Sequence, residues 1–104
     1  MTDKEIGIRN NAICVFMGGV AYVKNKHWKD LMDVEVRIMG LEDLLFNLSW
    51  SWLIPCWSKI RFKLSPVQVI NAITAIDEDN INELWLLLSQ VCIDWCKENN
   101  INLE

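Results

Sequence analysis

Cys92 and Cys96 are the residues whose type and spacing come closest to a chemical site. Because they lie four residues apart in a helical pattern, both sulfur atoms would share one helix face and could supply two ligands to a zinc ion. A structural zinc site needs two more ligands, yet Cys14, Cys56 and His27 lie in three different segments. The Cys-x-x-Cys spacing of zinc ribbons is absent from the sequence. We therefore predict packed, reduced thiols, with no metal and no cofactor.

No combination of residues in the sequence predicts catalysis. A thiol enzyme needs a base beside its cysteine, and His27, the only histidine, falls in a lysine-rich run typical of a solvated loop. The sequence has no glycine-rich phosphate loop and no Gly-x-Ser-x-Gly motif. Its acidic clusters, Glu42-Asp43 and Asp77-Glu78-Asp79, stand where helices are expected to begin, and capping explains them. We predict that the chain is not an enzyme and has no catalytic residue.

One segment, residues 22–29, has a pattern that suits single-stranded nucleic acid. It interleaves aromatic rings, which stack on bases, with lysines, which attract phosphates; the candidate contacts are Tyr22, Lys24, Lys26 and Trp28. The net charge of −4 and the pI near 4.9 oppose this interpretation, because phosphate binding needs a basic face. A solvated loop is the preferred interpretation, and a weak nucleic-acid binder is the alternative function.

The elements that would position these residues are mainly helical. A capping box at Thr2–Glu5 and apolar residues at helical spacing predict a first helix over residues 3–17, which Gly18-Gly19 ends. Trp50, Leu53, Ile54, Trp57 and Ile60 predict a second helix that contains Pro55. The alternating residues 59–64 fit either a helix tail or a short strand.

Two further helices follow in the pattern. Ser65-Pro66 has the form of an N-cap followed by proline at the first helical position, and Val69, Ile73 and Ile76 continue it. The last helix has the strongest stripe, formed by Ile81, Leu84, Leu88, Val91, Cys92 and Trp95. Residues 20–24 and 34–38 could instead pair as a short β-ribbon, because the second segment alternates between apolar and charged residues.

We predict one compact domain over residues 1–104, mainly α with three or four helices, and α+β as the alternative. Leu103-Glu104 also has the form of a cloning remnant and carries no weight in the prediction. The expected core is contributed mostly by the second and last helices and comprises Trp50, Leu53, Ile54, Trp57, Leu84, Leu88, Val91 and Trp95.

These two helices carry more apolar surface than one core face needs. Trp52 and Cys56 lie off the stripe of the second helix, as Leu86, Leu87 and Ile93 lie off that of the last. Two explanations stay open at this point. Either a central helix is buried on two sides, or Trp52, Leu86, Leu87 and Ile93 form a partner surface.

The cysteines and the N-terminus bear on location. All four cysteines lie in apolar runs, which favours reduced thiols and a cytoplasmic protein. A secretory signal begins with positively charged residues, and the acidic residues Asp3 and Glu5 do not fit this pattern. No apolar stretch reaches the roughly 18 residues that a membrane span needs.

Several segments resemble a group of small, uncharacterised bacterial and phage-type proteins. Residues 49–55, Ser-Trp-Ser-Trp-Leu-Ile-Pro, are similar to the Ser-Trp-Asp-Trp-Leu-Met-Pro segment of that group, with Ser51 in the acidic position. Phe16-Met17-Gly18 and residues 84–99 are also similar, with Cys96 in place of a tyrosine. The matches touch about half of the chain. The resemblance implies a compact cytoplasmic or mobile-element-borne domain, and it implies no activity or functional residue.

The functional prediction is a non-enzymatic interaction or accessory module, of the kind that a phage or mobile element carries. We expect a protein partner or self-association, and neither nucleic acid nor a membrane as the main partner.

Overall fold

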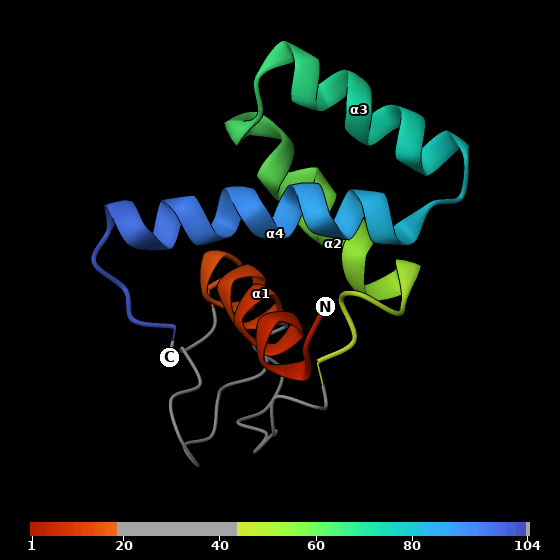
Figure 1. Cartoon of the computed structure of the whole chain (residues 1–104). Coiled ribbons are helices and arrows are strands. Elements are labelled where there is room, and N and C mark those ends of the chain that lie inside the picture. The colour runs from red at the N-terminus through yellow and green to blue at the C-terminus, as the bar shows by residue number, and fades with distance from the viewer. Residues whose placement is uncertain (19–43, 104) are drawn as a thin grey trace.

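The computed structural model describes residues 1–18 and 44–103, which form four α-helices and one 3₁₀ turn (Figure 1). The elements are α1 (Asp3–Phe16), α2 (Trp50–Ile60), the 3₁₀ turn (Arg61–Lys63), α3 (Pro66–Asp77) and α4 (Ile81–Glu98). The described residues contain no strand, so the mainly α fold class is confirmed. The predicted ribbon at residues 20–24 and 34–38 lies outside them.

Side-chain caps explain where the helices begin. The Thr2 hydroxyl accepts a hydrogen bond from the Glu5 amide at the start of α1. Ser65 and Gln68 exchange both bonds of a capping box at the start of α3, where Pro66 occupies the first helical position as predicted. Residues 59–64 are the end of α2 and the 3₁₀ turn, and not a strand.

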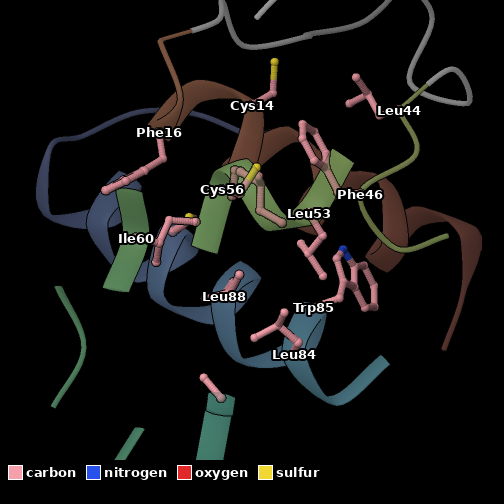
Figure 2. Close-up of a cluster of buried hydrophobic side chains, with 14 of the residues drawn as sticks. Cys14, Phe16, Leu44, Phe46, Leu53, Cys56, Ile60, Leu84, Trp85 and Leu88 are labelled. Atoms are coloured by element: carbon pink, nitrogen blue, oxygen red, sulfur yellow. The ribbon is translucent and has the colours of Figure 1, made fainter. Parts of the chain in front are cut away.

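Helix α4 lies at the centre of the fold. Helices α1, α2 and α3 all pack against it, which Figure 1 shows as α3 on one side and α1 on the other. Because it is surrounded, α4 buries residues beyond its predicted stripe, including Trp85, Ser89 and Cys96. Figure 2 shows Leu53 from α2 pointing toward Leu84 and Leu88 of α4 in the core. The burial of residues beyond the predicted stripe fits a central helix covered on more than one side, whereas Leu86, Leu87 and Ile93 are only half-buried.

The expected core was partly wrong. Leu53, Leu84 and Leu88 are fully buried, and the partly buried side chains that pack against the core include Trp50, Trp57, Val91 and Trp95. Ile54, however, is 37% exposed, because the inward face of α2 runs through Leu53, Cys56 and Ile60. Pro55 lies within α2 on its exposed side.

Polar side chains attach α1 to its neighbours. The Arg9 guanidinium donates to the Ser89 hydroxyl over 2.9 Å and lies 6.0 Å from the centre of the Trp85 ring. The Lys59 ammonium donates to the carbonyl of Phe16 over 3.2 Å, where α1 ends. A lysine at this position suits the partial negative charge of a helix C-terminus.

Candidate interaction surface

The two faces of helix α3 carry side chains of different size and exposure. The face toward α4 buries two alanines, Ala72 and Ala75. The opposite face carries bulky β-branched side chains: Val67, Ile70 and Ile73 are 66%, 63% and 53% exposed. The i, i+3, i+6 spacing of these three residues places them in one strip along the helix. We call this strip the outer face of α3.

The apolar residues that predicted α3 by their helical spacing do not all lie on one buried side. Val69 and Ile76 are half-buried, whereas Ile73 lies in the outer face. Hydrophobicity alone ranks isoleucine above alanine as a core residue. Alanines allow α3 to approach α4 more closely than isoleucine would, and this reverses the order here.

The outer face has no charge along its length. No Asp, Glu, Lys or Arg occurs between Ser65 and Ile76. The one hydroxyl on this side, that of Thr74, donates to the Ile70 carbonyl over 2.9 Å, so the helix itself satisfies it. Few polar groups on this part of α3 are therefore left for water to bind, the exposed amide of Asn71 among them.

Charges stand at the two ends of the outer face. Arg61 and Lys63 lie in the 3₁₀ turn just before α3, and the acidic run Asp77-Glu78-Asp79 lies at its other end. All five side chains are exposed. Phe62, between the two basic residues, is 76% exposed, and the Arg61 guanidinium lies 4.9 Å from its ring centre. The apolar strip thus has a basic end and an acidic end.

The cysteines lie in the core, away from this surface. Cys14, Cys56, Cys92 and Cys96 form no disulfide and all are buried. Burial raises the pKa of Cys56 to about 12, against which a backbone hydrogen bond and Lys59 act only weakly. Burial, followed by the neighbouring thiols, raises the pKa of Cys92 further, and burial also raises that of Cys96. These thiols stay protonated at neutral pH, which does not suit a nucleophile or a metal ligand.

The residues weighed as metal ligands do not gather into a ligand set within the described ranges. No group of three or more His, Cys, Asp or Glu side chains that could hold a metal ion occurs there. His27 lies outside those ranges. The absence of an enzyme site and of a cofactor stays a prediction.

The residues predicted as a partner surface are half-buried. Trp52, Leu86, Leu87 and Ile93 all pack against the core. The Trp52 ring also meets Phe46 edge to face, with 5.2 Å between the ring centres. As a partner surface these four residues stay a prediction, and each is more covered than the outer face of α3.

The nucleic-acid alternative falls outside the described residues. Its candidate contacts, Tyr22, Lys24, Lys26 and Trp28, belong to residues 19–43. A separate observation concerns membranes: across residues 1–18 and 44–103, no helix combines the length and the apolar character needed to cross one.

Comparison of the chain with protein-family models, curated proteins and solved structures gives no match. The resemblance carried by residues 49–55 and 84–99 therefore stays a prediction.

Sequence reasoning missed the outer face of α3. The signal that could have found it is the uncharged run from Ser65 to Ile76, which is unusual for a helix exposed on one side. The helical spacing of Val69, Ile73 and Ile76 predicts the helix but not which of its sides is covered.

Proposed function

We propose that this chain is a non-catalytic module that binds another protein chain through the outer face of α3. The observation that carries the proposal is the exposure of Val67, Ile70 and Ile73 by more than half on an uncharged strip. Contiguous apolar surface rimmed by polar residues is typical of interaction sites, because covering it removes apolar area from water.

Local preferences do not explain these side chains. β-branched residues are weaker helix formers than alanine, lysine or glutamate, which serve better on a solvent-exposed helix face. The outer face also adds nothing to the core, because Ala72 and Ala75 make the buried side of α3. A binding role gives Val67, Ile70 and Ile73 a function that neither helix formation nor packing gives them.

The buried chemistry supports a module without catalysis. The thiols of Cys56, Cys92 and Cys96 have raised pKa values and no exposed surface from which to attack a substrate. Free thiols of this kind also fit the cytoplasmic location that we propose. An accessory role beside a phage or mobile-element system, which the resemblance implies, belongs to the same proposal.

Thiol footprinting tests the proposal, because the buried native cysteines leave the background low. An Ile70→Cys variant would place one exposed thiol in the outer face, and Leu48→Cys would place one at a position that is 74% exposed elsewhere. Each variant is labelled with a maleimide as dilute purified protein and inside cells of the native host. We expect labelling at position 70, relative to position 48, to be slower in cells than in dilute solution.

Equal relative labelling rates in cells and in dilute solution would overturn the proposal, because the outer face would then be bare where the protein works. Both variants replace exposed side chains, so both should fold. A thermal melt of each purified variant checks this before labelling.

A further inference from the structure

Opposite charges flank the outer face of α3 at equal separations along the sequence. Ile70 is the middle residue of the outer face, with Val67 three residues before it and Ile73 three residues after it. Lys63 comes seven residues before Ile70, and Asp77 seven residues after it. Arg61 and Asp79 lie a further two residues out on the two sides. If a second copy of this segment runs in the opposite direction, its acidic residues therefore lie opposite the basic residues of the first copy, and its apolar residues lie opposite apolar residues.

We propose that the partner of the outer face is a second copy of this chain, with the two α3 helices packed antiparallel about a twofold axis at Ile70. This inference rests on the proposed function and names its partner. A twofold interface uses the same patch on both copies, so Val67 of each copy would meet Ile73 of the other, and the two Ile70 side chains would meet at the axis.

Electrostatics select the antiparallel orientation. In that orientation the basic 3₁₀ turn of one copy lies beside Asp77-Glu78-Asp79 of the other, and this happens at both ends of the pair. A parallel pair would place basic ends together and acidic ends together. The helix dipoles favour the same choice, because the positive N-terminus of each α3 then lies beside the negative C-terminus of its partner.

The length of the outer face of α3 limits the expected affinity of the dimer. Helix α3 has 12 residues, so it is about 18 Å long at 1.5 Å per residue. A pair of such helices buries less surface than the standard stable interface of about 1,600 Å². We therefore expect a weak dimer whose population rises with concentration.

Sedimentation equilibrium of the purified full chain, at concentrations up to roughly 1 mM, tests the inference. The unmodified chain should pass from monomer to dimer and stop there. Ile70→Lys would place two like charges at the axis and should weaken dimerisation by at least about tenfold. The matched control, Leu48→Lys, changes an exposed leucine outside α3 and should leave the dimerisation constant unchanged.

Charge exchange tests the orientation. Arg61→Glu with Lys63→Glu makes both ends of α3 acidic, and Asp77→Lys with Glu78→Lys makes both ends basic. Each pair of changes should weaken the dimer by at least about fivefold, because attraction becomes repulsion at both ends. Combining all four changes restores opposite ends and should return the constant to within about threefold of the original. A combined variant that stays as weak as either pair would overturn the antiparallel arrangement.

The result separates this inference from the function on which it rests. A chain that stays monomeric up to the highest concentration, yet shows protection of position 70 in cells, overturns the second copy as partner and leaves a different protein on the outer face. A chain that stays monomeric and shows no protection overturns both. If the Ile70→Lys variant dimerises as strongly as the unmodified chain, the inference is also overturned, because the dimer interface would then lie away from Ile70.

Discussion

At the scale of single residues, Asn10 joins three parts of the chain. Its side-chain oxygen accepts a hydrogen bond from the Trp85 indole over 2.8 Å, in the core between α1 and α4. Its amide nitrogen donates to the Asn47 side chain over 3.0 Å and to the Leu44 carbonyl over 3.4 Å. The amide group thus uses its acceptor and its donors in a fixed orientation.

Asn10→Ala should destabilise the fold by about 1–3 kcal/mol, because the Trp85 indole N–H would stay buried without a partner. Urea unfolding followed by tryptophan fluorescence measures the change. Asn71→Ala, at an exposed position of α3, is the matched control and should lie within about 0.5 kcal/mol of the parent. If both asparagine variants unfold alike, the buried hydrogen bond contributes nothing.

The buried thiols predict a loss of stability in alkali. The pKa of Cys56 rises from 9.0 to about 12 in the fold. The unfolded chain therefore releases this proton near pH 9 while the folded chain keeps it, and the free energy of unfolding falls as pH rises from about 9 toward 12. One such thiol contributes a slope of about 1.4 kcal/mol per pH unit.

The measurement is urea unfolding at several pH values between 8 and about 10.5, comparing the parent with Cys56→Ala. The variant should show the shallower decline above about pH 9, whatever its stability at neutral pH. Parallel curves for the two proteins would mean that the Cys56 thiol titrates alike in the folded and unfolded chains.

Residue types predicted some of these features and hid others. The packed, reduced state of the cysteines follows from their apolar surroundings in the sequence. The burial of Asn10, Asn11 and Ser89 does not, since polar residues in a helix pattern indicate the solvent side. Each of the three has a hydrogen-bond partner in a distant segment, as Asn10 has in Trp85, and local pattern carries no information about such pairs.

At the scale of elements, α4 holds the other helices together. Leu88 is fully buried in the core where α4 meets its neighbours. Leu88→Ala should cost about 2–5 kcal/mol, from lost transfer energy and the cavity left behind. Ile73→Ala, on the outer face of α3, should cost much less. Chemical denaturation compares the two, and similar losses would place Ile73 in the core and contradict the exposed outer face.

The sequence predicted which helices form more closely than it predicted which side of each helix faces the core. Caps at Thr2 and Ser65 gave the starts of α1 and α3, and the stripe through Leu84 and Leu88 gave α4. The inward face of α2 differed from prediction at Ile54. A helix turns its most apolar side inward only if the neighbour leaves room for it, and that room depends on packing across the whole fold.

At the scale of the whole molecule, the outer face is predicted to serve binding and not folding. A triple variant, Val67→Gln, Ile70→Lys and Ile73→Gln, should leave the unfolding free energy of dilute, monomeric protein within about 1 kcal/mol of the parent, because exposed positions contribute little packing. Thermal and urea unfolding measure this. A loss comparable with that of Leu88→Ala would mean that these side chains support the fold.

The central claim is that a protein chain covers the outer face of α3. Its most direct test replaces Ile70 with a photo-cross-linking amino acid in cells of the native host and maps the peptides joined to it. We expect a protein adduct at position 70, formed mainly through α3 of a second copy, and a far lower yield from the same amino acid at Leu48. No protein adduct at position 70, or equal yields at both positions, would contradict the account.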